Sequence, residues 1–226
     1  MSKTIALFLL CICHFHFSHS QSMFPKTYSY LALGDSYTIG EQVAARDNFP
    51  HQTVSLLEKE NYSFQLPVIV AKTGWTTDEL QEGIANAGLD KKYDFVSLLI
   101  GVNNQYRGRS KAEYGQQFEK LLMQSLQLAD NIPEHVFVLS IPDWGVTPFA
   151  EGRDRKLIGK EVDAFNAINK ELAVKYKVYY IDITPGTREA NCDLSLLAED
   201  KLHPSGKEYN RWAQELARAI LQQVRK

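Results

Sequence analysis

A serine, a histidine and an aspartate are arranged in this chain so that they could form a nucleophile and the groups that activate it. Ser36 ends the run Gly-Asp-Ser at 34–36, directly after an apolar segment, and Asp200 and His203 belong to Asp-Lys-Leu-His-Pro at 200–204. A serine hydroxyl is a weak nucleophile at neutral pH, so it needs a base, and the base needs an orienting group. We predict that Ser36 is the nucleophile, His203 the base and Asp200 the carboxylate.

Two further positions could stabilise the negative oxygen that forms when serine attacks an ester carbonyl. Gly74 lies in Lys-Thr-Gly-Trp-Thr at 72–76, and Asn103 lies in Gly-Val-Asn-Asn at 101–104. The backbone N–H groups of Ser36 and Gly74 and the side-chain amide of Asn103 can all donate hydrogen bonds to an oxyanion. We therefore predict an oxyanion hole made by Ser36, Gly74 and Asn103.

The segments around these residues alternate between strand and helix patterns. Nearly continuous apolar runs predict buried strands at 28–33, 66–71, 93–100, 135–141 and 178–183. Helical periodicity lies between and after them, at about 49–60, 76–87, 114–129, 158–172 and 212–224. This alternation predicts an α/β fold, a three-layer α/β/α sandwich around a five-stranded parallel sheet. Ligands of such sheets bind beyond the carboxyl ends of the strands, where all the candidate residues fall.

In this order, the four blocks resemble the SGNH (GDSL-type) hydrolase family, and the resemblance runs from about residue 28 to the C-terminus. Ser36, Gly74, Asn103 and His203 match the four residues that name the family, and Asp200 matches its triad acid. The resemblance implies a flavodoxin-like fold and a reaction that needs no metal or organic cofactor. Two positions depart from the pattern: Tyr37 follows the serine where Leu is usual, and Asn104 stands where Asp is usual.

Each motif alone is a weak indication. Gly-Asp-Ser after a strand is commonly a turn, and an Asp followed by Pro-Ser-Gly commonly marks a loop before a helix. The joint occurrence, with each block after a successive strand or before the last helix, strongly favours catalysis. The chain has no Gly-x-Ser-x-Gly run, which disfavours the α/β-hydrolase fold as the alternative serine hydrolase.

Aromatic residues in the loops that follow the strands are candidates for a substrate pocket. We predict that Tyr37, Trp75 and Trp144 line it, with Phe149 beside them, although ordinary packing of loop aromatics explains such positions about as well. Four arginines in neighbouring loops could contact a charged substrate, but a solvated surface is the better expectation for them. They are Arg107, Arg109, Arg153 and Arg155.

The first twenty residues have the pattern of a secretory signal peptide. Lys3 precedes an apolar segment at 5–13, and Ser18 and Ser20 are small residues at the positions expected before a cleavage site. A membrane anchor is disfavoured because the apolar stretch is shorter than the ~20 residues that span a bilayer. We predict a signal peptide at 1–20, a single domain at 21–226 and a secreted or periplasmic protein without a stable membrane anchor.

Composition excludes several other functions. The formal net charge is −2 and no basic patch stands out, so nucleic acid is not an expected partner. Without the leader, the chain keeps one cysteine, Cys192, and three histidines, His51, His135 and His203, which makes a zinc site improbable. The oligomeric state is not indicated.

These observations predict a serine esterase that hydrolyses small-molecule carboxylic esters, with short-chain acyl or acetyl esters favoured. Three alternatives stay open at this stage: a lysophospholipase or thioesterase, acyl transfer to a sugar by the same residues, and a non-catalytic carbohydrate-binding protein on the same fold. Only the departure at Asn104 supports the last of these.

Overall fold

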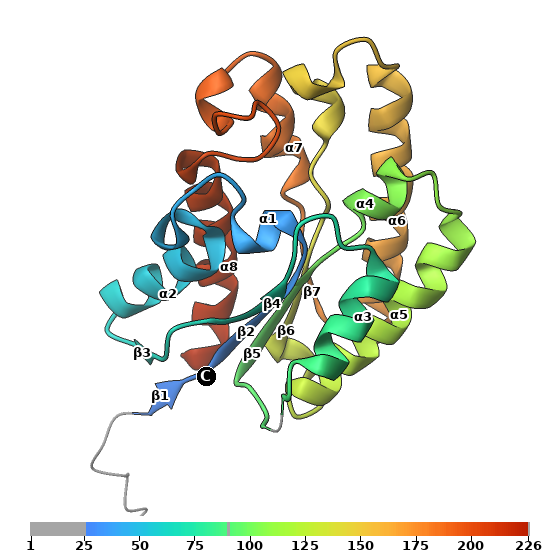
Figure 1. Cartoon of the computed structure of the whole chain (residues 1–226). Coiled ribbons are helices and arrows are strands. Elements are labelled where there is room, and N and C mark those ends of the chain that lie inside the picture. Colours follow the sequence, from blue (N-terminus) through green and yellow to red (C-terminus); the bar gives the residue numbers. More distant parts are fainter. Residues whose placement is uncertain (1–25, 90, 226) are drawn as a thin grey trace, which may run out of the picture.

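The computed structural model describes residues 26–89 and 91–225, so the predicted signal peptide lies outside the described residues. At its centre is a parallel sheet with the strand order β4-β2-β5-β6-β7 (Figure 1). The strands are β2 (Tyr30–Gly34), β4 (Val68–Ala71), β5 (Phe95–Leu99), β6 (Val136–Leu139) and β7 (Tyr179–Ile181). Counted along the chain, this order is 2-1-3-4-5, which is that of the flavodoxin-like folds.

The predicted strands are confirmed, although each is shorter than its apolar run. Every residue of β2, β5 and β6 is buried, because helices cover both faces of the sheet. The edge strands β4 and β7 are only partly buried. A separate parallel pair, β1 (Thr27–Tyr28) with β3 (Ser63–Phe64), accounts for the start of the first apolar run.

Helices form the outer two layers. In Figure 1, α2 and α8 lie on one side of the sheet, and α3, α5 and α6 lie on the other. These longer helices match the predicted periodic segments. Their bounds are Phe49–Lys59 for α2, Thr77–Asn86 for α3, Lys111–Leu128 for α5, Arg155–Tyr176 for α6 and Gly206–Val224 for α8.

Three short helices near the carboxyl ends of the strands were not predicted. They are α1 (Ser36–Ile39), α4 (Val102–Tyr106) and α7 (Thr184–Thr187). Segments of four or five residues are too short to show a helical period in the sequence. Two of them carry predicted site residues, because α1 begins at Ser36 and α4 contains Asn103.

The turn between β5 and α4 depends on a glycine. Gly101 has φ of +130°, and a Cβ added there would lie 2.5 Å from the hydroxyl oxygen of Tyr114. Tyr114 is fully buried, and its hydroxyl lies 3.0 Å from the Ile100 carbonyl oxygen. The tyrosine therefore packs directly beneath the turn that leads to Asn103.

Replacing Gly101 by alanine should therefore destabilise the fold through both backbone strain and overpacking. We expect Gly101→Ala to lower the free energy of unfolding by about 3 kcal/mol, as measured by urea denaturation. Gly88→Ala is the matched control, because Gly88 has φ of +61° but a Cβ added there would meet nothing within 4 Å. That control should lose only about 1 kcal/mol. Equal losses would contradict the role given to Tyr114.

Candidate active site

Ser36 is positioned by a tight turn at the carboxyl end of β2. A Cβ on Gly34 would lie 2.4 Å from the Leu99 carbonyl oxygen and 2.1 Å from Oγ1 of Thr38, so only glycine fits there. Asp35 then caps α1, because its carboxylate accepts a hydrogen bond from the Tyr37 N–H at 3.0 Å. Ser36 is consequently held at the first position of α1, next to the end of β5.

The sheet topology explains why a site forms here. β2 and β5 are neighbours, but the chain leaves β2 toward α2 on one face and leaves β5 toward α5 on the other (Figure 1). Such a switch point opens a crevice beyond the strand ends. Ser36 follows one of these two strands and Asn103 follows the other.

His203 reaches Ser36 from a loop at the far end of the chain. Its Nε2 lies 3.0 Å from Ser36 Oγ, and its Nδ1 lies 2.5 Å from Asp200 Oδ2. The other carboxylate oxygen of Asp200 accepts the N–H groups of Leu202 and His203, each at 3.0 Å. With Nδ1 donating to Asp200, Nε2 is the ring nitrogen that can accept the serine proton.

The charge of Asp200 suits this arrangement. Partial burial opposes ionisation, but the hydrogen bonds from the His203 ring and from two backbone N–H groups outweigh it and lower the pKa of Asp200 below its usual value. The carboxylate therefore stays ionised at neutral pH, where it can hold the histidine ring and stabilise its protonated form.

The three predicted oxyanion-hole residues line one pocket. Gly74 and Asn103 line the same pocket as Ser36 and His203. Gly74 has φ of +84°, which favours glycine, and its carbonyl accepts a 2.7 Å hydrogen bond from Arg107. Within residues 26–89 and 91–225, the N–H groups of Ser36 and Gly74 have no hydrogen-bond acceptor. Both are therefore available to a ligand.

Asn103 is held between two partners. Its Nδ2 donates to the Trp75 carbonyl at 3.0 Å and lies 3.4 Å from Asp35 Oδ2. The first contact fixes the amide against the loop that carries Gly74. The second is long for a hydrogen bond, so one N–H of the amide is only weakly engaged.

Asn104, where the chain departs from the family pattern, forms hydrogen bonds between two helices. Its Oδ1 accepts the Thr77 N–H at 3.1 Å, and its Nδ2 donates to the Thr77 hydroxyl at 2.8 Å. That hydroxyl in turn donates to Gln117. The fully buried amide thus joins α4 to the start of α3, so the departure at this position leaves a satisfied hydrogen-bond network.

The pocket over Ser36 has a volume of about 210 Å³ and is mainly apolar. Tyr106, Trp144 and Phe149 form one aromatic wall, with ring centroids 5.3 to 6.3 Å apart. Thr73 is a polar residue at its edge and donates to Glu41. The remaining lining residues are Tyr37, Val102 and Leu202.

The structure separates the predicted pocket residues. Tyr37, Trp144 and Phe149 line the pocket over Ser36. Trp75 does not: its indole packs against Gly83 of α3, where an added Cβ would lie 2.2 Å from the ring, and it faces a different hollow. The structure therefore places Trp75 outside this pocket, because Gly83 lacks a side chain and lets the indole pack directly on the helix that follows.

Sequence reasoning missed Thr73, Val102, Tyr106 and Leu202 as pocket residues. Val102 and Tyr106 are four residues apart, so a helix starting just after Gly101 would have placed them on one face. Leu202 and Thr73 each adjoin a predicted site residue.

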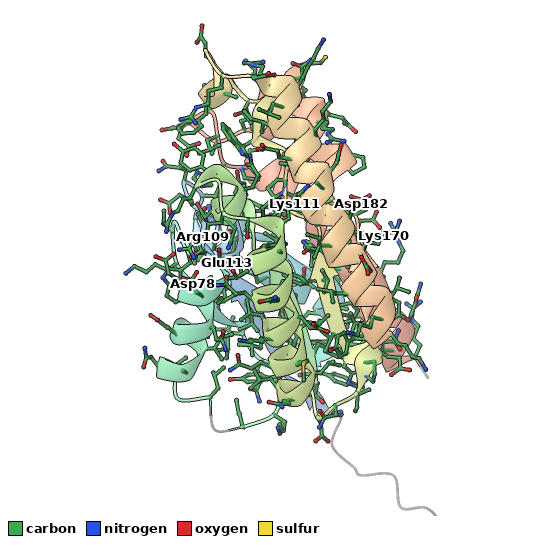
Figure 2. All side chains as sticks on the ribbon, turned by 90° about the vertical axis from the view of Figure 1, so that its right-hand side faces the viewer. Asp78, Arg109, Lys111, Glu113, Lys170 and Asp182 are labelled. Atoms are coloured by element: carbon green, nitrogen blue, oxygen red, sulfur yellow. The ribbon has the colours of Figure 1, made fainter. Side chains whose placement is uncertain are left out.

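All four arginines have partners within the protein, and two of these partners belong to pocket residues. They are the Gly74 carbonyl, bound by Arg107, and the Tyr106 hydroxyl, bound by Arg153. Arg107 pairs with Glu79 at 3.3 Å, and Arg109 lies between Asp78 and Glu113 on the surface shown in Figure 2. Arg155 donates to the Thr147 carbonyl at 3.1 Å. Arg153 stacks behind the aromatic wall, with its guanidinium carbon 5.0 Å from the Tyr106 ring centroid.

In the described part of the chain, no group of three or more His, Cys, Asp or Glu side chains is placed to hold a metal ion. None of the helices among the described residues combines the length and apolar character of a membrane-spanning segment.

Comparison with known proteins identifies the family. Residues 32–211 match the sequence profile of the GDSL-like lipase/acylhydrolase family. The chain belongs to this family. It is a carboxylic ester hydrolase, as the sequence predicted. The comparison with curated proteins returns no match.

Solved structures of similar fold are distant in sequence from this GDSL-family protein. TesA is 17% identical, with a TM-score of 0.66 over 86% of this chain and 98% of its own. The esterase EstA from Pseudoalteromonas sp., in a structure inhibited by monoethylphosphonate, is 12% identical, with a TM-score of 0.66 over 88% of this chain and 100% of its own. Axe2, an acetylxylan esterase from Geobacillus stearothermophilus, is 20% identical, with a TM-score of 0.64 over 87% and 94%. At these identities the likeness shows the fold.

The buried carboxyl of Asp35, next to Ser36, has a raised pKa. Burial raises the pKa of this carboxyl to about 7, although hydrogen bonds from the Tyr37 N–H and Asn103 partly oppose the shift. In an unfolded chain an aspartate titrates near pH ~4, so the folded protein binds more protons between pH ~4 and about 7. Asp35 therefore favours folding below pH ~4, and this contribution is lost as the pH rises through about 7.

We expect Asp35→Asn to remove this pH dependence. Relative to the wild type, the variant should gain stability as the pH rises from ~4 to ~7, by at most roughly 4 kcal/mol. Urea denaturation across this range measures the difference. Parallel stability curves for the two proteins would contradict a buried, shifted carboxyl.

Asp94→Asn is a control of opposite sign. Burial opposes ionisation of Asp94, but hydrogen bonds from Lys26 and Ser29 lower its pKa. Its contribution to folding is therefore present above pH ~4 and lost as the pH falls below that value. The variant should differ most from the wild type at neutral pH and least in acid.

Proposed function

We propose that this protein hydrolyses short-chain acyl esters through Ser36, His203 and Asp200. The observation that carries the proposal is the continuous chain of contacts from Asp200 through the His203 ring to Ser36 Oγ, at 2.5 and 3.0 Å. Ser36 and His203 line one pocket together with Gly74 and Asn103, whose N–H groups can donate hydrogen bonds.

In the first half of the reaction, Ser36 Oγ attacks the ester carbonyl carbon while His203 Nε2 takes the hydroxyl proton. Asp200 stabilises the imidazolium that results. The oxyanion is bound by the free N–H groups of Ser36 and Gly74 and by the weakly engaged N–H of Asn103. Each such donor is typically worth ~10²–10³ in rate.

In the second half, His203 returns the proton to the departing alcohol oxygen, and the carbon–oxygen bond of the ester breaks. Water then attacks the acyl-serine, with the same histidine as the base, and releases the carboxylic acid. Ser36 and the neutral histidine are restored, so no cofactor is consumed.

The size of the pocket favours a short acyl group. A volume of about 210 Å³ is small beside the 300–1,000 Å³ of typical ligand pockets. The aromatic wall and Leu202 leave an apolar space beside Ser36, which suits an acyl or alcohol group without charge. The acetylxylan esterase named above makes acetylated sugars reasonable candidates, and EstA supports phosphonates as inhibitors to try.

The proposal predicts that ester hydrolysis requires Ser36. We expect initial rates on p-nitrophenyl acetate and butyrate to fall by at least ~10³ in Ser36→Ala, because the nucleophile is lost while the fold remains. A fluorophosphonate probe should label the wild type at Ser36 and leave the variant unlabelled. Ser195→Ala replaces an exposed serine that does not line the pocket, so it is the matched control and should keep wild-type rates.

Two results would overturn the proposal. Retained activity in a pure Ser36→Ala preparation would remove the serine from the mechanism. Absence of both hydrolysis and fluorophosphonate labelling in the folded wild type would favour a binding protein that keeps the fold.

We further propose export, on the argument from the N-terminal sequence alone. We expect the protein expressed in a secreting host to be recovered outside the cytoplasm with an N-terminus near Gln21, as read by intact mass. Recovery of cytoplasmic protein that retains Lys3 would contradict this.

A further inference from the structure

Two hollows in the described structure share a wall beside Ser36. Tyr37, Trp144 and Leu202 line the catalytic pocket, and the same three residues line a second cavity behind it. The second cavity, which we call the back cavity, has a volume of only about 20 Å³. A group that passed the shared wall from the catalytic side would enter it.

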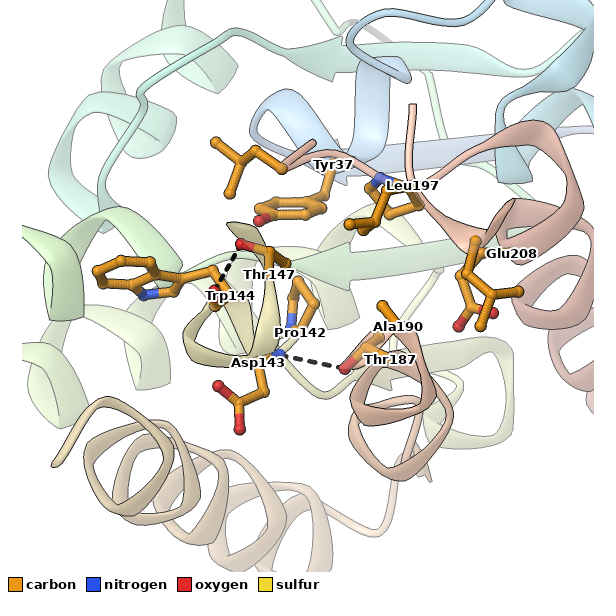
Figure 3. A pocket seen from close by; sticks show the side chains of 12 residues that line it. Tyr37, Pro142, Asp143, Trp144, Thr147, Thr187, Ala190, Leu197 and Glu208 are labelled. Carbon is orange, nitrogen blue, oxygen red and sulfur yellow. Dashed lines mark hydrogen bonds between the residues drawn. The ribbon is translucent and has the colours of Figure 1, made fainter. Parts of the chain in front are cut away.

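The surface of the back cavity is apolar. Five residues provide aliphatic or ring carbon to it, and Figure 3 shows several of them around Tyr37. They are Pro142, Ala190, Leu196, Leu197 and Pro204. Hydrocarbon is the ligand chemistry that such a lining favours.

The two carboxylates at the back cavity are already engaged. Asp143 accepts a 2.9 Å hydrogen bond from Arg188 Nε, and Glu208 accepts one of 2.8 Å from Trp212 Nε1. Both groups are therefore satisfied by the protein. Neither is left to attract a polar or cationic ligand.

Two of the three wall residues are held in place. Trp144 donates through Nε1 to Gln105 at 2.7 Å, and the Tyr37 ring lies 5.1 Å from the His203 ring and 6.4 Å from that of Trp212. Leu202 has no polar side-chain atom and is half-buried. Its contribution to the triad loop is its backbone N–H, which donates to Asp200.

We propose that Leu202 limits the acyl length that this enzyme accepts. The leucine side chain closes the catalytic pocket toward the back cavity, and the back cavity is the latent extension for a longer acyl chain. The inference rests on the proposed function, since it assumes that the acyl group binds beside Ser36. It assigns to Leu202 a role in specificity that is separate from the chemistry of its neighbour His203.

Shortening the leucine should join the two hollows. Leu202→Ala removes three carbons from the wall, so an acyl chain could extend through the space of the leucine into the back cavity. One methylene in an apolar pocket is typically worth ~10-fold or more in kcat/KM. We expect the ratio of kcat/KM for p-nitrophenyl octanoate to that for the butyrate to rise at least ~10-fold in this variant.

Two further variants separate a joined cavity from a general loosening of the site. Leu196→Ala enlarges the back cavity but leaves the wall intact, so its octanoate-to-butyrate ratio of kcat/KM should stay within ~2-fold of the wild-type ratio. Ala190→Val, added to Leu202→Ala, refills the back cavity and should cancel most of the gain. The butyrate rate serves in every case as the internal measure of triad function.

The outcomes distinguish this inference from the proposed function. If the wild type hydrolyses no ester at a rate that depends on Ser36, the proposed function itself is overturned. A wild type that is active on butyrate, with an unchanged ratio in Leu202→Ala, would overturn only the role of Leu202. A gain in Leu196→Ala as large as in Leu202→Ala, or a gain that Ala190→Val leaves intact, would also overturn it.

Discussion

The close approach of β2 and β5 at their carboxyl ends is the constraint on which the rest of the site depends. At Gly34 the neighbouring strand's Leu99 carbonyl occupies the space where any side chain would begin. Only glycine therefore fits at position 34. The chain then turns directly into α1, whose first residue is Ser36. The same strand pair carries Asn103 on the other side of the topological switch. Ser36 and the Asn103 amide are thus adjacent because two strands pack tightly, and because the helices that follow them leave in opposite directions.

The interactions that hold the groups around Ser36 join residues at very different separations along the chain. Asp200 and His203 are three residues apart, and one carboxylate organises their loop through two backbone N–H groups and the imidazole. The contact between His203 and Ser36 spans 167 residues and exists only in the folded chain. A local motif therefore orients the His203 ring, while the sheet places Ser36 against it. Buried Asp35 adds a carboxyl whose ionisation the folded state disfavours.

The pocket combines a rigid side and a softer side. Trp144 is hydrogen-bonded to Gln105, and Tyr106 and Phe149 pack edge-on against it, so the aromatic wall is built from elements after two different strands. Leu202, which shares a wall with Tyr37 and Trp144, contributes only dispersion and apolar contact. Under the proposed function, specificity for acyl length is set by one aliphatic residue next to His203, without any change in the hydrogen bonds that orient this histidine.

The sequence by itself determined the α/β class, the five strands and the longer helices, because continuous apolar runs and helical periodicity report burial directly. It also indicated Ser36, Asp200, His203, Gly74 and Asn103 through local motifs. Only the tertiary structure decided which aromatics face the pocket. Trp75 and Trp144 each follow a strand in the sequence. The Trp75 ring packs on Gly83 of α3, whereas the Trp144 ring is hydrogen-bonded to Gln105 and lines the pocket with Ser36. The short helices were not predictable because four or five residues are too few to show a helical period. The wall at Leu202 was not predictable because it arises from contacts between segments far apart in the chain.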